Sequence, residues 1–279
     1  MRPTRFQPQA TPAHPRCLRL ILLLLLVCAP AHAQRWERHS DDRKGVPDWE
    51  VDKAMPEDVF TFVRLRYSSR WRQKWAVDYP DSDLNFSYRL QQLTSLEVDP
   101  NGKVIDLADD AIFDYPFVYM IEPGDISLSP KEVENLRRYL LNGGFLMVDD
   151  FWGYREWQAL YDQLQIVFPG REPDELEIDH PIFHIVFDLK EKPQVPDIGT
   201  ALQGRSMGIT WEWRKAGAEE VHYYALYDDN GRMMAIICHN TDLGDGWERE
   251  GESEWYFKEF AEKKAYPMGI NIVFYALTH

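Results

Sequence analysis

The chain has 279 residues, 44% of them hydrophobic, and its 46 acidic and 31 basic side chains give a net charge of −15. An acidic protein without a stripe of lysine or arginine repels a phosphate backbone, so this composition argues against nucleic acid as a partner. A chain of this length can bury roughly 70% or more of its surface, which is enough for one domain without disulfide bonds.

The N-terminal segment has the pattern of a secretory signal peptide. Residues 1–33 contain four arginines and no acid, and include the apolar run 20–27 and the final small-residue sequence Ala31-His32-Ala33. An apolar run bounded in this way is typical of an export signal, with cleavage expected after Ala33. The run is shorter than the roughly 20 residues that span a bilayer, so we expect no membrane span after cleavage. The mature protein would be periplasmic or secreted, with a net charge of −19 because all 46 acids lie beyond residue 33.

A polar arm is expected to precede a single domain. Residues 34–55 are polar and have no sustained hydrophobic period, which predicts an N-terminal arm or linker. β-branched and aromatic residues become frequent immediately afterwards, so we place the domain over residues 56–279.

Strands and helices alternate in the first part of this domain. Ser129 followed by Pro130 is typical of a helix start, and Gly143-Gly144 of a helix end. Alternation in short units indicates an α/β fold with a mostly parallel sheet and crossover helices. The predicted strands are residues 59–67, 117–121 and 145–148, and the predicted helices are residues 83–95 and 130–141.

The second part of the domain is predicted to be less regular. Apolar residues at helical spacing predict a helix over about residues 157–168, which ends near Pro169-Gly170. Asp228-Asp229-Asn230-Gly231 predicts the turn of a hairpin between two strands. The further predicted elements are a loop at residues 193–196, strands at 207–213, 221–227 and 233–238, and helices at 254–263 and 269–278.

Two carboxylates directly follow the third predicted strand. In an open α/β sheet the carboxyl ends of the strands border the ligand crevice, so Asp149 and Asp150 lie where binding or chemistry is expected. Close carboxylates can hold a hard cation or divide acid and base roles between them. The alternative is that one acid caps the following helix while the other is solvated.

A pair of histidines forms a second candidate group. His180 and His184 are four residues apart, a spacing that would place both on one face of a helix and allow them to bind a metal. Pro181 instead favours His180 as a cap or turn residue, and the zinc-protease motif requires a glutamate at that position. Structural packing is therefore the alternative to a metal site here.

The polar segment 239–248 forms a third candidate group. It leaves the buried strand that ends at Cys238, so we predict a shaped loop that brings His239, Asn240 and Asp242 to the crevice. Asp242 and Asp245 could bind calcium, although the spacing of a calcium-binding loop is absent. A structural loop fixed by Asx turns is the alternative.

Aromatic and basic residues follow the first strand and form the fourth group. Tyr67, Arg70, Trp71 and Trp75 lie close together in the sequence. Exposed rings beside an arginine suit a sugar or an anionic ligand.

Several common catalytic motifs are absent from the sequence. It has no Gly-rich phosphate loop, no Gly-x-Ser-x-Gly elbow and no Cys-x-x-Cys pair, which disfavours phosphate-driven and serine-hydrolase chemistry. Cys238 would be the single cysteine of the mature chain, and its apolar neighbours predict a buried thiol rather than a nucleophile.

Seven segments together resemble the bacterial family called domain of unknown function 4159, from about Phe60 to His279. The family has no established biochemical activity, so this resemblance implies a fold more than a reaction. The segments are residues 60–67, residues 75 and 78–80, residues 115–119, residues 141–146 with 149–150, residues 179–183, residues 239–242 and residues 269–279.

The family is similar in plan to the class I glutamine amidotransferase-like superfamily, which implies a flavodoxin-like three-layer α/β/α sandwich with a mostly parallel sheet. Glutaminases of that superfamily need a cysteine on a tight strand-to-helix turn. Asp149 and Asp150 stand at the comparable turn and Cys238 lies inside a strand, so we do not expect glutamine hydrolysis. The resemblance also implies a link to MoxR-type ATPases and von Willebrand factor A domains, and hence an envelope partner.

Three functions remain open from the sequence. The leading hypothesis is an exported protein that binds a small polar ligand, such as a carbohydrate, or an envelope partner. Its predicted crevice consists of Tyr67, Asp149, Asp150, His180, His239, Asn240 and Asp242, with no cofactor. The second is a hydrolase that uses a divalent metal, with Asp149, Asp150, His180, His184 and His239 as candidate ligands. The third is a non-catalytic interaction domain.

Overall fold

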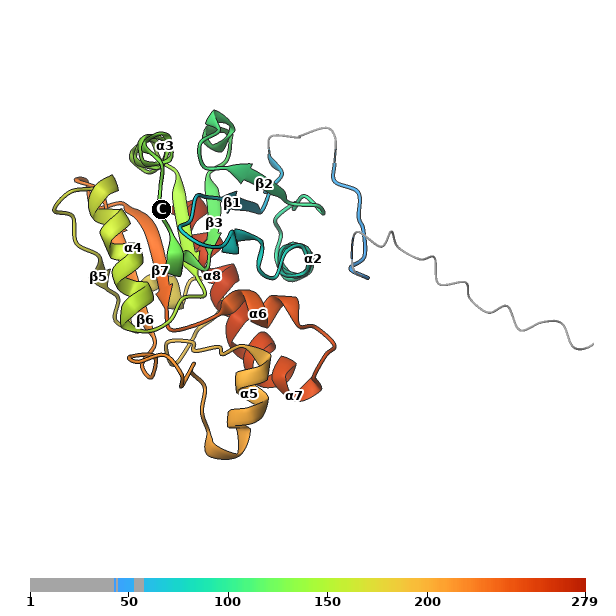
Figure 1. Ribbon diagram of the computed structural model, residues 1–279. Coiled ribbons are helices and arrows are strands. Elements are labelled where there is room, and N and C mark those ends of the chain that lie inside the picture. Colours follow the sequence, from blue (N-terminus) through green and yellow to red (C-terminus); the bar gives the residue numbers. More distant parts are fainter. Residues whose placement is uncertain (1–42, 44, 53–57) are drawn as a thin grey trace, which may run out of the picture. The chain divides into compact units, whose positions relative to one another are not determined.

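The computed structural model describes residues 43, 45–52 and 58–279 (Figure 1). The predicted signal peptide, residues 1–33, lies outside the described residues, as does the first part of the predicted arm. None of the helices in the described residues is long and apolar enough to span a bilayer.

Seven strands of the described chain form one sheet in the order β2-β1-β3-β4-β7-β6-β5. The first five in this order run parallel, whereas β6 pairs antiparallel with β7 and β5 antiparallel with β6. The expectation of an α/β fold with a mostly parallel sheet is confirmed. The strands are β1 (Val63–Arg66), β2 (Lys103–Asp106), β3 (Phe117–Ile121), β4 (Phe145–Asp149), β5 (Asp174–Glu175), β6 (His222–Tyr227) and β7 (Met233–His239).

Helices cover the sheet on both faces (Figure 1). The α-helices are α2 (Asp81–Leu93), α3 (Pro130–Leu141), α4 (Gly153–Val167), α5 (Ile198–Gly204), α6 (Leu243–Glu248), α7 (Glu254–Tyr256) and α8 (Tyr266–Thr278). A π-helix, η8 (Phe257–Ala265), joins α7 to α8, and the 3₁₀ turns are η3 (Lys74–Ala76), η4 (Asp110–Asp114), η5 (Pro123–Asp125), η6 (Pro181–Phe183) and η7 (Arg205–Met207).

The core consists of two apolar clusters, one on each face of the sheet. Alternate residues of a strand point to opposite faces, so Phe145 and Met147 of β4 join one cluster and Leu146 and Val148 join the other. The first cluster includes side chains of α2, α5, α6, η8 and α8, and the second includes those of α3 and α4. Every residue of β3 and β4 is buried, as expected for central parallel strands.

The predicted helix over residues 130–141 shows how local sequence sets an element. Ser129 and Glu132 form a reciprocal capping box, which satisfies backbone N–H groups at the start of α3. Leu136 and Leu140 are buried against the sheet, and Gly143 ends the helix with a φ of 105°.

Two predictions about the second half of the chain are wrong. Residues 207–213 form no strand: Met207, which is exposed, ends η7, and residues 208–213 are irregular chain. Residues 239–248 are not a loop throughout, because residues 243–248 form α6. Gly246 lets this helix approach η8 so closely that a Cβ on it would lie 2.5 Å from the Cβ of Ala265.

Part of the predicted N-terminal arm is docked on the domain. The Arg43 guanidinium donates to the carbonyl of Pro100 at 2.9 Å and to the side chain of Asn101 at 2.7 Å. The Trp49 indole donates to the carbonyl of Val98 at 2.8 Å, and its ring packs against Tyr88. We call residues 43 and 45–52 the strap.

Candidate functional site

Carboxylates gather at the edge where the parallel strands end. Asp78 comes from the β1–α2 connection, Asp150 follows β4, and Asp242 follows β7. Oxygen atoms of these three side chains lie within 4.8 Å of one another. Asp245 and Glu248 of α6 form a second such group with the same Asp78. We call these five residues the acid cluster.

The backbone at this edge is unusual. The four non-glycine residues of the described chain with positive φ are Asp78 (61°), Glu122 (53°), Asp150 (52°) and Asn240 (61°). Three of them directly follow β3, β4 and β7, and the fourth is a member of the acid cluster. Such conformations cost free energy and concentrate at functional sites, so their position marks this edge as the candidate site.

Arg64 holds the connection that carries Asp78. This residue lies on β1 and is fully buried. Its guanidinium pairs with Asp83, donates to Ser82 Oγ at 2.8 Å, and donates to the carbonyls of Trp75 and Val77 at 3.0 and 2.9 Å. The last two bonds fix the chain one and three residues before Asp78, so Arg64 sets the position of that carboxylate.

Asp149 lies beneath the acid cluster and is fully buried. Its Oδ2 accepts from the Tyr119 hydroxyl at 3.1 Å and from the Gly244 N–H at 3.0 Å, whereas Oδ1 has no hydrogen-bond partner. Burial raises the pKa of Asp149 to about 7. A Cβ on Gly244 would lie 2.8 Å from the Tyr119 hydroxyl and 3.0 Å from Asp78 Oδ2, so only glycine leaves these groups their present positions.

Burial and mutual repulsion act together on the acid cluster. The pKa values of Asp78, Asp150 and Asp242 are raised well above the ordinary value, first by burial and then by neighbouring carboxylates. The pKa of Glu248 is raised to about 7 for the same reasons, with Asp245 as one of the repelling groups. These groups therefore resist simultaneous ionisation unless positive charge is added between them.

Arg249 supplies positive charge at one end of the acid cluster, where its Nε lies 2.6 Å from Glu248 Oε2 and 3.3 Å from Asp245 Oδ1. In the described part of the chain, no basic side chain lies within ion-pair distance of Asp78, Asp150 or Asp242. Asp150 Oδ1 accepts from the Trp152 indole at 3.1 Å, and Asp242 Oδ1 caps α6 by accepting from the Asp245 N–H at 2.7 Å. Asp78 Oδ2 is buried and has no hydrogen-bond partner. Several carboxylate oxygens at one point are the donor set that hard divalent cations such as Ca²⁺, Mg²⁺ or Mn²⁺ prefer.

Two residues predicted for the crevice have other contacts. Asn240 is buried and its amide is fully used, because Oδ1 accepts from Gly153 N–H and Nδ2 donates to the carbonyls of Gly217 and Glu220. The Tyr67 hydroxyl donates to the carbonyls of Ile121 and Glu122. Both side chains tie loops together at the carboxyl edge.

His239 lies on the other face of the sheet from Cys238, in an aromatic pocket. Its ring centroid is 4.9 Å from that of Phe151, 5.1 Å from that of Trp157 and 5.8 Å from that of His222. Burial lowers the pKa of His239 to about 4, so the imidazole is neutral at pH 7. Its Nε2 donates to the Gly153 carbonyl at 3.3 Å, and Nδ1 has no partner.

The structure does not bring the histidine pair to the acid cluster. His180 caps η6 and packs against Tyr275. Tyr275 also contacts Phe145, the first residue of β4, whereas Asp149 is the last residue of that strand. His180 is therefore near the opposite end of β4 from the acid cluster. His184 is bound to Asp188 and to the Ile178 carbonyl. Pro181 decides this geometry, because it starts a short 3₁₀ turn instead of a helix that would align the two rings.

Sequence reasoning missed Asp78 and Glu248 as site residues. Asp78 is part of the segment that carries the family resemblance, and a cis Tyr79-Pro80 bond follows it. The sequence Asp78-Tyr79-Pro80 was the available signal: an aromatic residue before proline favours an irregular connection between elements, and the acid stands directly before it. Glu248 gave no signal, because its place depends on the unexpected helix α6.

A family model described as "Domain of unknown function (DUF4159)" matches residues 61–277. The chain therefore belongs to this family. No curated protein matches the sequence.

Proposed function

We propose that this member of the DUF4159 family binds one hard divalent cation at the acid cluster and, through it, a small oxygen-rich ligand. Asp78, Asp150 and Asp242 would hold the cation. The observation that carries the proposal is their convergence within 4.8 Å while a buried oxygen of Asp78 has no hydrogen-bond partner.

Electrostatics supports a cation over an empty polar site. Burying several carboxylates together is costly unless they are protonated or paired, because both desolvation and mutual repulsion oppose their ionisation. Arg249 pairs with Asp245 and Glu248 at one end of the acid cluster. Of the other positive side chains nearby, Arg64 is paired with Asp83, and Lys74 with Glu122. Among the described residues, no basic side chain lies within ion-pair distance of Asp78, Asp150 or Asp242. A divalent ion would compensate two negative charges at once and would use the free oxygen of Asp78.

The bound cation would also supply a way to recognise a ligand. Hard cations favour hydroxyl, carbonyl and carboxylate oxygens, and Ca²⁺ takes about six to eight of them. Three carboxylates therefore leave coordination positions for oxygens of water or of a small polar ligand. A carbohydrate, which offers neighbouring hydroxyl groups, is the ligand class we favour.

The test is metal binding by the purified chain. After treatment with chelator and its removal, calorimetric titration with Ca²⁺, Mg²⁺ and Mn²⁺ should reveal one cation per chain for at least one metal. The Asp150→Asn, Asp242→Asn double variant should lose at least tenfold in affinity, because it removes two of the three proposed ligands.

The matched control is the Asp188→Asn, Asp229→Asn double variant. Both residues are exposed and pair with surface cations, so the change in charge is the same but the acid cluster is untouched. Affinity should equal that of the wild type. Absence of saturable binding for all three metals, or an equal loss in the control, would overturn the proposal.

A metal-dependent hydrolase is the second candidate, and Glu248 favours it. This carboxylate lies beside Asp78 and Asp245, is partly exposed, and has a pKa raised to about 7, which suits a general base near neutral pH. A bound divalent cation would lower the pKa of a water molecule, and Glu248 would accept its proton. Glu248→Gln should abolish turnover of a responsive chromogenic ester or glycoside while the cation still binds; turnover that survives would exclude this role.

Three further proposals follow from the family resemblance and the N-terminal sequence. We infer a three-layer α/β/α sandwich of the flavodoxin-like, class I glutamine amidotransferase-like type, supported by helices on both faces of the parallel strands. We infer export to the periplasm or beyond, supported by the signal-peptide pattern. An envelope partner, in a system with a MoxR-type ATPase and von Willebrand factor A proteins, rests on the resemblance alone.

A further inference from the structure

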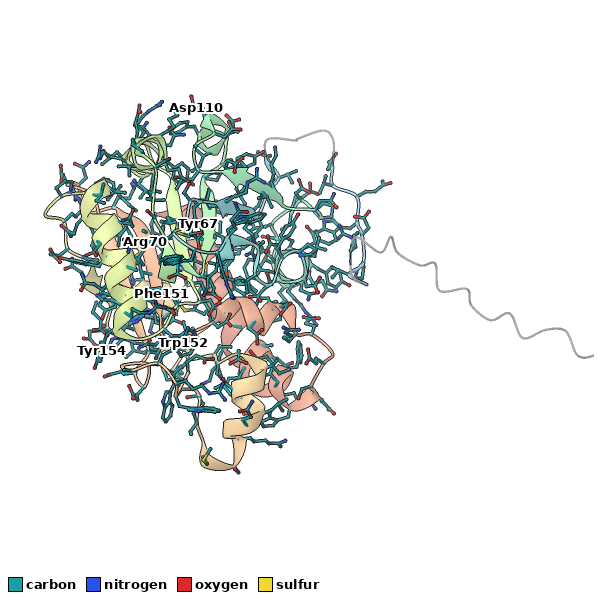
Figure 2. All side chains as sticks on the ribbon, in the orientation of Figure 1. Tyr67, Arg70, Asp110, Phe151, Trp152 and Tyr154 are labelled. Carbon is teal, nitrogen blue, oxygen red and sulfur yellow. The ribbon has the colours of Figure 1, made fainter. Side chains whose placement is uncertain are left out.

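Two pockets lie side by side at the start of α4 and share Arg155 as a wall. The first has a volume of about 380 Å³, and its lining includes Arg70, Trp71, Asp125, Arg155, Gln158 and Asp162. The second has a volume of about 370 Å³, and its lining includes Trp152, Tyr154, Arg155, Glu156, Arg214 and Lys215. We call them the Trp71 pocket and the Tyr154 pocket. Figure 2 shows Arg70, Trp152 and Tyr154 around the segment that joins β4 to α4.

Each pocket has a large exposed aromatic ring at its rim. Trp71 is 83% exposed and Tyr154 is 73% exposed, which are the two highest values among the exposed large hydrophobic residues. Such rings combine an apolar face with a polar edge, and they occur in ligand sites together with a few polar groups that fix orientation. The C–H face of a pyranose ring is a fitting partner for each.

The Trp71 pocket offers both donors and acceptors. Arg70 has no carboxylate within ion-pair distance in the described part of the chain. Arg155 is 77% exposed, and its guanidinium lies 3.6 Å from carboxylate oxygens of Asp125 and Glu156, which is longer than a hydrogen bond. Asp125, Gln158 and Asp162 add acceptors and an amide. This balance suits the hydroxyl groups of an uncharged sugar unit, which donate and accept hydrogen bonds.

The Tyr154 pocket has an excess of positive charge. Arg155, Arg214 and Lys215 line it against the single carboxylate of Glu156, whose oxygens already bind Lys215 at 3.2 Å and the Trp152 N–H at 2.9 Å. Among the described residues Arg214 has no acidic partner within ion-pair distance and lies over the ring of Trp213. In a chain of net charge −15, such a concentration of cations favours a ligand unit that bears a carboxylate.

The same charge balance argues against denser polyanions. A net charge of −15 repels nucleic acid and an anionic membrane surface, whereas a short oligosaccharide with only a few carboxylates carries little total charge and is repelled less. The two pockets are also small and separate, which fits single rings better than a continuous backbone.

We propose that these pockets are two subsites for an acidic oligosaccharide, with one sugar ring on Trp71 and a carboxylate-bearing unit in the Tyr154 pocket. Trp152 lines the second pocket and donates to Asp150, so the sugar would lie beside the acid cluster. Because it names the ligand of the proposed cation-dependent site, this inference rests on the proposed function.

The experiment titrates the full chain with trigalacturonic acid and a hyaluronan tetrasaccharide, with maltotriose as the uncharged reference. Calorimetry is performed once with the preferred cation and once with EDTA, which separates the sugar surface from the acid cluster. At least one acidic sugar should bind tenfold more tightly than maltotriose when the cation is present. Trp71→Ala and Arg155→Ala should each weaken this binding at least tenfold without changing affinity for the cation.

Met207→Ala and Lys258→Ala are the matched controls, since both side chains are exposed and lie outside the two pockets. Cation binding without any response to either acidic sugar would overturn this inference and leave the proposed function intact. Sugar binding that persists in EDTA and needs Arg155, in a chain that binds no metal, would overturn the proposed function alone. Tighter binding to a single-stranded DNA oligomer or to phosphatidylglycerol vesicles would overturn the sugar assignment.

Discussion

Two groups of buried charge lie close together in this molecule and differ in how they are compensated. Arg64 is fully buried, and Asp83, Ser82 and two backbone carbonyls accept hydrogen bonds from its guanidinium. The acid cluster is also largely buried, yet its carboxylates repel one another and Asp78 Oδ2 has no partner. The first group is compensated within the protein. In the second, Arg249 pairs with Asp245 and Glu248, whereas Asp78, Asp150 and Asp242 have no basic partner among the described residues.

This difference separates a structural role from a binding role without reference to sequence motifs. A buried ion pair with every donor used stabilises one conformation, and removal of one partner is costly. Buried carboxylates without partners lower stability until a cation binds. The comparison therefore predicts opposite responses to mutation in the two groups.

The largest effect is expected for Arg64→Met. This change would leave Asp83 buried without its partner and would free the carbonyls that hold the Asp78 connection, at a cost of about 3–5 kcal/mol. Urea denaturation followed by far-UV circular dichroism measures the loss. The control is Arg66→Met on the same strand, where the ion pair with Asp106 is about half exposed and little change is expected. Equal losses in the two variants would contradict the comparison.

His239 sharpens the comparison, because it is a buried base that remains neutral. Burial lowers its pKa from 6.5 to about 4, so between these values the unfolded chain binds more protons than the folded one. Its contribution to stability is therefore complete above about pH 6.5 and falls by up to about 3 kcal/mol as the pH drops through 4.

The measurement compares wild type with His239→Phe between pH 4 and pH 7. Asp149 has a raised pKa and acts in the opposite direction over the same range, so the difference between the two proteins isolates the histidine. That difference in unfolding free energy should change with pH. A constant difference would show that the imidazole is not kept neutral by its pocket.

Cation removal should have the next largest effect. With the preferred metal at about 100 times its Kd, wild type should gain about 2.7 kcal/mol in stability relative to the chelated protein. Asp150→Asn should lose most of this gain and should itself be more stable than wild type in EDTA, because it removes one of the repelling charges. If Asp150→Asn is less stable than wild type in EDTA, Asp150 stabilises the fold itself, as Arg64 does, and is not a carboxylate that awaits a cation.

Gly244→Ala should have the smallest effect on stability. Alanine favours a helix, yet the new Cβ would lie 2.8 Å from the Tyr119 hydroxyl and 3.0 Å from Asp78 Oδ2, so we expect a loss of about 1–2 kcal/mol and weaker cation binding. Gly199→Ala in α5 is the control, since its Cβ would meet only the side chain of Asp197. Unchanged cation affinity in Gly244→Ala would separate this contact from the site.

The sequence predicted those parts of the fold in which local and tertiary preferences agree. The strand over residues 117–121 and the helix over residues 130–141 match β3 and α3, because one is continuously apolar and the other has both caps and an apolar face. β2 was missed because a half-buried edge strand of four residues has little pattern. α6 was predicted as loop because its glycines and aspartates are ordinary loop residues, and only packing against η8 makes them favourable in a helix.

The candidate site was predictable only in part, for a similar reason. Asp149 ends β4, Asp150 follows it and Asp242 follows β7, and the rule that parallel strands end at one edge placed them together. Asp78 lies in a connection whose course depends on Arg64, a contact between elements that no local pattern encodes. His239 packs against the ring of Phe151, and Pro181 makes His180 the cap of a short turn. These tertiary and local contacts keep both histidines from acting as the metal ligands that the sequence suggested.

The strap changes where this protein can be cut or fused. The family match begins at residue 61, yet Trp49 and Arg43 provide donors for the carbonyls of Val98 and Pro100. A recombinant fragment designed on the limits of homology would remove these donors and uncover apolar surface near Tyr88. A recombinant chain that keeps these contacts should therefore begin before residue 43 and not at residue 61.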